Sequence, residues 1–356
     1  MRKILLISYG EIEYDGRLRS LIEVFSQMGE VVALTRGEKP ISLHNVVCHC
    51  RYPQFIIKAV KMARKLDKID WLVLDNRKAT IPGMIIKKII KPALVIQDCR
   101  ELYLAKEIKH FSGKIGCFFE GIMIRKADIV ICANQERASI MKKNYNLSIE
   151  PLTFENLRQL QYDSIESEKK AKEKILPLLH EGETRIISTS GCSISRTNDL
   201  LVTNMAEIGG KSRLYLVGEN KGDDESIIRK IIQDMHLSNV EIIGRLNQSE
   251  LKYLISHCHI GIVNYGKFDT NNLFCASGKL FEFIYEGIPV VTTTNPPLKR
   301  ICDDFNVGIA DDEYYNGINE VINRYDYYKE AVKGFAATYT IQNNNQKLIN
   351  DILNRV

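Results

Sequence analysis

The chain alternates short, continuous apolar runs with longer segments in which apolar residues recur every three or four positions. Continuous runs at Lys3–Ser8, Val31–Thr35, Trp71–Leu74 and Ala93–Ile96 predict strands that are buried on both faces. Between the first two runs, Arg17–Met28 repeats its apolar residues at helical spacing. This order of strand, helix and strand predicts a parallel sheet with helices on its faces.

The same pattern begins again in the second half of the chain. Its strand-like runs are Arg185–Thr189, Arg213–Gly218, Val240–Gly244, Ile260–Val263 and Val290–Thr294. The charge-rich segment Ser164–Lys174 separates the two series and is typical of a solvated helix near a linker. We therefore predict an α/β fold with two doubly wound, Rossmann-like domains at 1–160 and 184–330, followed by helix in 331–356.

Charge differs between the two halves of the chain. The 356 residues carry a net charge of +5, but residues 1–150 contain 26 Lys and Arg against 16 Asp and Glu, whereas the remainder is net acidic. Basic amphipathic segments at Ile56–Lys68 and Met84–Lys91 fit either an anionic membrane surface or an ordinary solvated helix face. Interleaved aromatic residues that would stack on bases are missing, so a nucleic acid is not an expected partner.

The sequence shows no pattern of a membrane span, of a nicotinamide-binding turn or of a metal site. No run of 18 apolar residues predicts a membrane span, and the nine cysteines lie mostly in apolar runs, as reduced thiols of a cytoplasmic protein do. The glycines at 10 and 16 do not form the G-x-G-x-x-G turn of a nicotinamide-binding domain. No metal-ligand spacing stands out, so we expect neither a metal nor another cofactor.

Candidate chemistry is concentrated in residues 271–294. Ser277 is a plausible N-cap for a helix that Gly287 and Pro289 end, and the run after Pro289 predicts a buried strand. Lys279 and Glu282 share a face of this helix, where the free amides of the N-terminus attract phosphate. Lys279 is placed to add positive charge there, and Glu282 to accept hydrogen bonds from a ribose; the alternative is a solvated ion pair.

The Lys-Leu-Phe-Glu core followed by Gly-Ile-Pro-Val-Val resembles the donor-binding element of GT-B glycosyltransferases, in the large family-4-like group. Asp15-Gly16-Arg17, Asp98-Cys99-Arg100-Glu101 and Ala127-Asp128-Ile129-Val130-Ile131 resemble further motifs of that group. The resemblance implies two domains facing across a cleft, an N-terminal domain for the acceptor, a C-terminal domain for the nucleotide-sugar, and a last helix that crosses back to the N-domain. This sequence departs from the pattern where Thr197-Asn198 replaces Lys-Gly, where Phe274 replaces a glutamate, and where Arg100 replaces a histidine.

The resemblance also implies site residues. Those assigned to the donor are Gly191, Gly218, Gly244, Arg245, Ser277, Gly278, Lys279, Leu280 and Glu282. Those assigned to the cleft and acceptor are Gly10, Asp15, Gly16, Arg17 and Asp98. Arg100, Arg196 and Lys279 are the expected catalytic charges, which stabilise a leaving diphosphate.

The expected function is therefore transfer of a sugar, from a UDP-sugar rather than another nucleotide-sugar, to a hydroxyl of a glycan or lipid-linked acceptor. The resemblance implies retention of anomeric configuration without a metal held by an Asp-x-Asp motif. Capsule, O-antigen or exopolysaccharide assembly at the inner face of the plasma membrane fits a basic chain without a membrane span. The alternatives are a catalytically silent GT-B subunit or binding module, and a non-hydrolysing UDP-sugar epimerase.

Overall fold

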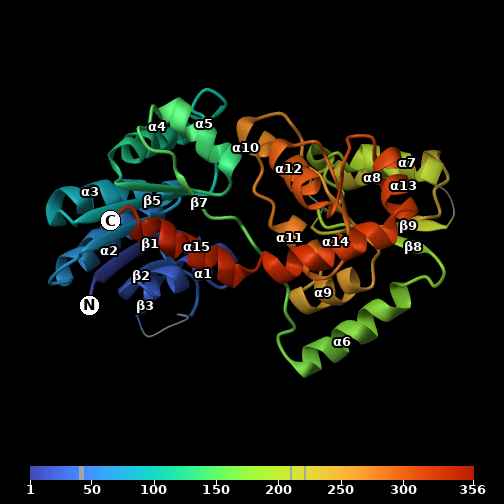
Figure 1. The fold of residues 1–356 in the computed structure, drawn as a ribbon, viewed down its shortest axis with the longest axis horizontal. Helices are drawn as coiled ribbons and strands as arrows, with labels where there is room; N and C mark the ends of the chain where they lie inside the picture. The colour runs from blue at the N-terminus through green and yellow to red at the C-terminus, as the bar shows by residue number, and fades with distance from the viewer. Residues whose placement is uncertain (40–43, 209–210, 220–221) are drawn as a thin grey trace. The chain divides into compact units, whose positions relative to one another are not determined.

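A computed structural model describes residues 1–39, 44–208, 211–219 and 222–356. The chain forms two compact units (Figure 1): unit 1 comprises Met1–Asn156 and Ile341–Val356, and unit 2 comprises Leu157–Thr340. The prediction of two parallel-sheet domains is confirmed. The unit boundaries differ from the expected limits at 160, 184 and 330, because the segment around 165–183 and the helix before residue 340 both pack within unit 2.

Unit 1 is built on a seven-stranded parallel sheet with the order β3-β2-β1-β4-β5-β6-β7. Its strands are β1 (Lys3–Glu11), β2 (Glu30–Arg36), β3 (Asn45–Cys48), β4 (Trp71–Asp75), β5 (Leu94–Cys99), β6 (Ile129–Cys132) and β7 (Leu152–Thr153). Its helices are α1 (Gly16–Ser26), α2 (Tyr52–Lys65), α3 (Thr80–Ile90), α4 (Phe111–Lys126), α5 (Gln135–Tyr145) and α15 (Ile341–Leu353), with a 3-10 turn η1 at Arg77–Ala79.

Helices cover both faces of this sheet. On one face, α1 and the final helix α15 pack together, and Leu348, Ile349 and Ile352 of α15 complete a core with the strands. On the other face, α2, α3 and α4 contribute Phe55, Ile86 and Met123 to a second core. The chain's last helix is thus part of unit 1, whose sheet it covers.

Unit 2 is built on a six-stranded parallel sheet with the order β10-β9-β8-β11-β12-β13. Its strands are β8 (Thr184–Ser188), β9 (Ser212–Val217), β10 (Val240–Ile243), β11 (Ile260–Val263), β12 (Val290–Thr292) and β13 (Gly308–Ala310). Its helices are α6 (Ile165–Ile175), α7 (Asn198–Ile208), α8 (Asp224–Asp234), α9 (Gln248–Ser256), α10 (Thr270–Leu273), α11 (Gly278–Tyr285), α12 (Pro296–Phe305), α13 (Tyr314–Asn323) and α14 (Tyr325–Thr338). Two 3-10 turns, η2 and η3, lie at Leu176–Leu178 and Ile194–Arg196.

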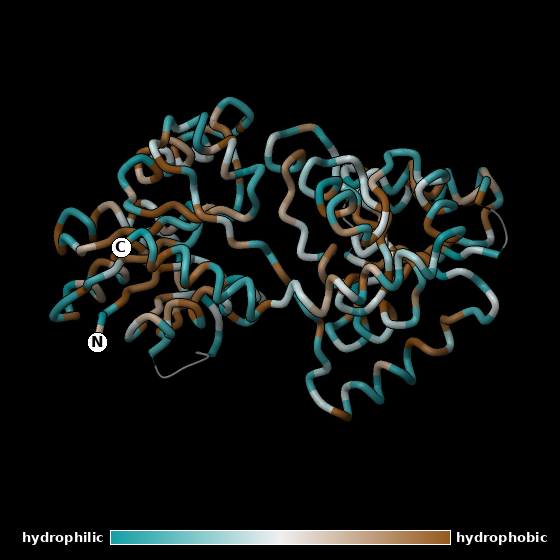
Figure 2. Tube along the Cα trace, in the orientation of Figure 1, coloured by the Kyte–Doolittle hydropathy of each residue, from teal (hydrophilic) through white to brown (hydrophobic). Residues whose placement is uncertain are grey.

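The charge-rich segment before β8 is a packed helix of unit 2. Figure 2 shows mostly hydrophilic residues along α6, yet Ala171 and Ile175 are buried. α6 packs on α9, where Lys174 Nζ lies 2.9 Å from a carboxylate oxygen of Glu250. A capping box at Ser164 starts the helix. Two buried positions are enough to attach a helix whose other faces remain in solvent.

Each sheet has one point at which the direction of strand succession reverses. In unit 1 the chain adds β2 and β3 on one side of β1 and β4 on the other, so the reversal lies between β1 and β4. In unit 2 the equivalent point lies between β8 and β11. Open parallel sheets bind ligands at such points, beyond the carboxyl ends of the strands. Within the ranges described above, no helix is both long and apolar enough to cross a bilayer.

The close packing of α11 on β11 generates a prediction for Gly261. A Cβ at this position would lie 2.4 Å from the Phe283 ring, so Gly261→Ala forces the core apart. Overpacking of this kind costs roughly 1–3 kcal/mol and should lower the Tm by about 3–8 °C in calorimetry. Gly334→Ala is the matched control, because nothing lies within 4 Å of its Cβ position in α14. It should leave the Tm unchanged or raise it slightly, since alanine favours helix.

Candidate functional site

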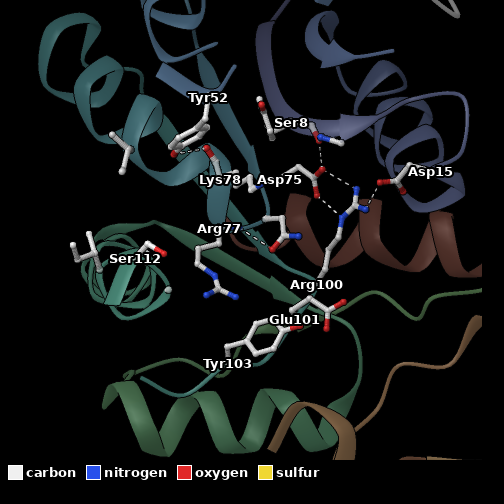
Figure 3. A pocket seen from close by; sticks show the side chains of 17 residues that line it. Ser8, Asp15, Tyr52, Asp75, Arg77, Lys78, Arg100, Glu101, Tyr103 and Ser112 are labelled. Carbon is white, nitrogen blue, oxygen red and sulfur yellow. Dashed lines mark hydrogen bonds and ion pairs between the residues drawn. The ribbon is translucent and has the colours of Figure 1, made fainter. Parts of the chain in front are cut away.

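A cavity of about 820 Å³ lies in unit 1 at the carboxyl ends of β1 and β4. Figure 3 shows Ser8 and Asp75 entering it from these two strands, with Arg100 from the segment after β5. Tyr52, Arg77 and other side chains complete the lining, and Gly10 and Ser112 also contribute to it. The cavity therefore occupies the position at which a sheet of this topology binds ligands.

Arg100 is the centre of an ion-pair network in this cavity. Its Nε and Nη2 donate to the two carboxylate oxygens of Asp75 at 2.6 and 2.7 Å, and its Nη1 donates to Asp15. Figure 3 shows the guanidinium held between the two carboxylates. The sequence analysis assigns Arg100 as one of the expected catalytic charges. Asp75 and Asp15 neutralise the guanidinium, and the catalytic role of Arg100 stays a prediction.

Asp75 is a site residue that the sequence analysis does not identify. It ends β4, is buried, and also accepts a hydrogen bond from Ser8 Oγ. Burial raises the pKa of Asp75 to about 6, and the positive charge of Arg100 opposes this shift. An acidic residue directly after a buried strand is the available signal, but only the strand order places this one beside β1.

Arg17 and Asp98 form a buried ion pair under the sheet end and do not line the cavity. Arg17 Nη2 lies 2.6 Å from Asp98 Oδ1, and Asp98 has no exposed surface. Arg17 also donates to the carbonyl of Phe154. Each side chain is occupied in joining α1 to β5, and a contact of these two residues with an acceptor stays a prediction.

The two predicted glycines in unit 1 have different surroundings. Gly10 lines the cavity, and a Cβ there would lie 3.0 Å from Asp15 Oδ2 and 3.1 Å from Ser8 Oγ. Gly16 begins α1 and has open space around its Cβ position. Asp15 caps α1 by accepting a hydrogen bond from the Leu18 amide while it binds Arg100. The loop after β1 is thus held by the same carboxylate that holds the arginine.

The second candidate site lies in unit 2 at the carboxyl ends of β8 and β11. Gly191 adopts φ +60°, and its amide donates to the carbonyl of Val217 at 2.8 Å. A Cβ on Gly218 would lie 2.9 Å from the Gly191 nitrogen, so the two loops approach more closely than side chains allow. The two predicted glycines therefore meet, as expected of backbone that must come close to a ligand.

Positive charge gathers beside these loops. Lys279 Nζ donates to the carbonyl of Thr189 at 2.6 Å, directly after β8. Burial and the charge of Arg196 lower the pKa of Lys279 to about 8. Arg158 lies near enough to lower it further, while Glu282 raises it. We call Arg158, Arg196, Lys279 and Glu282 the unit 2 cluster; it contains three cations and one carboxylate.

Glu282 and Arg158 are paired within the cluster. Arg158 Nε lies 3.1 Å from Glu282 Oε1, and Glu282 is 3% exposed whereas the Arg158 side chain is 49% exposed. Glu282 thus forms its ion pair with Arg158 and not with Lys279, which was the alternative interpretation of the sequence. Arg158 lies near the end of the range 1–160 that the sequence analysis assigns to the first domain, and no motif marks it.

The ring of Tyr265 packs against Arg196 of the cluster. The guanidinium of Arg196 lies 3.7 Å from the centre of the Tyr265 ring, and Tyr265 follows β11. Ser277 is the N-cap residue of α11, as predicted, but its side chain makes no capping hydrogen bond. The first amides of α11 are therefore not capped by this hydroxyl and remain available to a ligand.

The other predicted donor residues differ in their surroundings. Gly278 is the first residue of α11, beside Lys279. Leu280 points into the core with 1% exposure, so its side chain does not contact a ligand. Gly244 and Arg245 follow the edge strand β10 and are exposed. The Gly218 amide donates to the carbonyl of Ile243 at 3.3 Å, which links the end of β10 to the glycine pair.

Across the described ranges, no group of three or more His, Cys, Asp or Glu side chains is arranged to hold a metal ion. The three cations of the unit 2 cluster can compensate the charge of an anionic ligand. The chemistry available is thus binding of a phosphorylated ligand in unit 2 and of a polar, hydroxyl-bearing ligand in the cavity of unit 1.

Comparison with solved structures agrees with this arrangement. HepE from Anabaena, solved in complex with UDP-glucose, matches with a TM-score of 0.73 and 15% identity over 100% of both chains. Sucrose-phosphate synthase from Thermosynechococcus elongatus has a TM-score of 0.68 and 15% identity over 100% of both chains. UDP-GlcNAc 2-epimerase from Neisseria meningitidis, bound to UDP-GlcNAc, has a TM-score of 0.61 and 12% identity over 99% of this chain and 100% of that one. No protein-family model and no curated protein matches the sequence.

These likenesses span the whole chain, and the chain has the GT-B fold, which confirms the fold that the sequence motifs predicted. The family-4-like character stays a prediction. At 12–15% identity the comparisons establish architecture, whereas the chemistry has to be argued from the site.

The Arg100 network generates a stability prediction. Arg100→Met leaves Asp75 buried without its cation, which should cost about 3 kcal/mol or more of unfolding free energy. Adding Asp75→Asn removes the unpaired charge and should recover a large part of that loss. Trp71, the single tryptophan, lies in β4, so its fluorescence during urea unfolding reports on unit 1.

Arg64→Met is the matched control, because Arg64 is exposed on α2. It should change the unfolding free energy by less than about 0.5 kcal/mol. Equal losses in Arg100→Met and in the double variant would contradict the ion-pair assignment.

Proposed function

We propose that the protein is a glycosyltransferase that uses a nucleotide-sugar, with a UDP-sugar as the favoured donor. The observation that carries this proposal is the unit 2 cluster at the reversal point between β8 and β11. Arg196 and Lys279 exceed the carboxylates there by two positive charges once Arg158 and Glu282 are paired. A sugar diphosphate ester brings two negative charges, and proteins of the same fold have been solved with UDP-glucose and with UDP.

The donor diphosphate would be bound by Arg196, Lys279 and the first amides of α11. Gly191 and Gly218 would bring backbone close to the phosphates, and Glu282 would accept hydrogen bonds from the ribose through Oε2, since Arg158 holds Oε1. As the bond to the sugar breaks, negative charge grows on the leaving diphosphate, where these groups already lie. Preorganised positive charge is commonly the largest catalytic contribution. We propose that no protein-bound metal is needed and that anomeric configuration is retained.

The acceptor would bind in the cavity of unit 1. Asp75 and Asp15 offer carboxylate oxygens and Tyr52 and Tyr103 offer ring faces, a combination that suits a polyhydroxylated glycan. Arg100 would act as a positioning residue that holds Asp75 and Asp15, because its own charge is neutralised. A glycan or lipid-linked acceptor of cell-surface polysaccharide assembly, at the inner face of the plasma membrane, fits these groups and the basic N-terminal half.

An epimerase is the second candidate, because one structural match is a UDP-GlcNAc 2-epimerase. An epimerase would need carboxylates and histidines at its site, but neither the cavity lining nor the unit 2 cluster includes a histidine. Incubation with UDP-GlcNAc followed by sugar analysis separates the two reactions. Release of a 2-epimer would favour the epimerase, whereas transfer or slow donor hydrolysis favours the glycosyltransferase.

A thermal-shift panel of UDP, GDP, CMP and dTDP with their sugar conjugates tests the donor site. A ligand at 100 times its Kd stabilises by about 2.7 kcal/mol, so the preferred nucleotide should raise the Tm clearly. Glu282→Ala should reduce that shift.

Lys279→Ala should reduce kcat/KM on the order of 100-fold or more while the fold is retained. Lys230→Ala, exposed on α8, is the control; silence of the whole panel would favour a binding module without catalysis.

The lowered pKa of Lys279 predicts how donor affinity depends on pH. Because burial brings this pKa to about 8, the neutral amine is populated above that pH and the ammonium below it. UDP should therefore bind about tenfold more weakly at pH 9 than at pH 7 in isothermal titration calorimetry. The arginine of the Lys279→Arg variant stays charged from pH 7 to pH 9. Any change in UDP affinity that this variant shows over that range therefore comes from ionisation of the ligand. An equally steep loss in that variant would contradict the assignment.

A further inference from the structure

The outer layer formed by α2, α3 and α4 carries one sign of charge. The three helices pack on the same face of the unit 1 sheet, with α3 between the other two. Together their sequences contain nine lysines and arginines and one acidic residue, Glu120. Glu120 is buried at 3% exposure and faces Arg77, so the solvent side of the layer presents cations from these helices without carboxylates.

The same layer exposes large apolar side chains. On α4, Phe111 is 78%, Ile115 40% and Phe118 63% exposed, at spacings of four and three that place them on one helix face. Ile85 and Ile89 are exposed on the neighbouring α3. Exposed apolar residues are ordinary singly, but a row of this kind among lysines indicates an interaction surface. The sequence analysis singles out the basic segments of α2 and α3 but not α4.

This surface is continuous with the cavity. Ile115 is part of both, and Ser112, Gly113 and Gly116 of α4 line the cavity wall. Tyr52, the first residue of α2, and Ile81 of α3 line it from the other side. Figure 3 shows Ser112 and Tyr52 at the cavity that also holds Asp75. A ligand in the cavity can therefore contact Ile115 of the exposed apolar row on α4.

We propose that the α2–α4 layer docks on an anionic lipid bilayer, with Phe111 and Phe118 inserted between the headgroups and the lysines on lipid phosphates. The acceptor would then be an amphiphile whose polar part enters the cavity from the bilayer; this second statement rests on the proposed function. Aromatic residues flanked by lysines are the composition of segments that lie in the membrane interface.

Charge complementarity favours a bilayer over a protein partner. The cores of protein interfaces are depleted in lysine, because its charge and flexible side chain are costly to bury. A second copy of the same surface would bring two sets of cations together without carboxylates to offset them. A bilayer offers both anionic headgroups for the lysines and an apolar interior for the phenylalanines of this face.

Flotation of the protein with vesicles tests the docking. Vesicles of phosphatidylcholine with phosphatidylglycerol should bind the protein, and phosphatidylcholine alone should not.

Phe111→Ser/Phe118→Ser should weaken binding by about tenfold or more. Lys88→Glu/Lys114→Glu should also weaken it, and added salt should weaken wild-type binding. Ile165→Ser/Ile227→Ser is the matched control, because both isoleucines are exposed on unit 2, and it should bind like the wild type.

Three results would overturn the docking: no flotation of the wild type, undiminished flotation of the phenylalanine variant, or equal binding to neutral vesicles. Light scattering that shows a dimer lost in the phenylalanine variant would replace the bilayer by a protein contact. The nucleotide thermal shift is measured on the same samples. A retained shift without flotation rejects only the docking, whereas flotation without any shift rejects only the proposed function.

Discussion

A parallel sheet that is buried on both faces leaves only its strand ends for chemistry, and both units obey this constraint. Residues inside the strands are committed to the cores, as Leu5, Val73 and Ile262 are. The candidate groups therefore follow strands: Asp75 ends β4, Arg100 follows β5, and Tyr265 follows β11. Their proximity depends on strand order, which brings together loops that are far apart along the chain.

The two sites balance charge in opposite ways. In unit 1, Arg100 is matched by Asp75 and Asp15, so this network has no positive charge left to attract an anion. In unit 2, Glu282 offsets only one of three neighbouring cations, and the pKa of Lys279 is lowered, first by burial and then by the charges of Arg196 and Arg158. An incomplete charge balance in a folded protein is a cost that a ligand can relieve. This difference is the physical reason for assigning the phosphorylated ligand to unit 2.

Local pattern was sufficient for most of the fold and for part of the site. The long helices and continuous apolar strands were predicted because their residues repeat at regular spacing, and Lys279 and Ser277 because a recognisable helix start surrounds them. Asp75 and Arg158 were missed, since their importance arises from partners 25 and 124 positions away. Likewise, the short edge strands β3 and β7 have too few residues to show a period, and the exposure of Phe111 appears only after packing.

Unit 1 is assembled from two separate parts of the chain, and this has a consequence during synthesis. Unit 2 is continuous from Leu157 to Thr340, so it can acquire its core as soon as that span has left the ribosome. Unit 1 begins first but must wait for Leu348, Ile349 and Ile352, which cover the α1 side of its sheet. Until they arrive, apolar side chains of the earliest-made strands stay open to solvent and to chaperones. The half of the protein that is made first is thus the last to be finished.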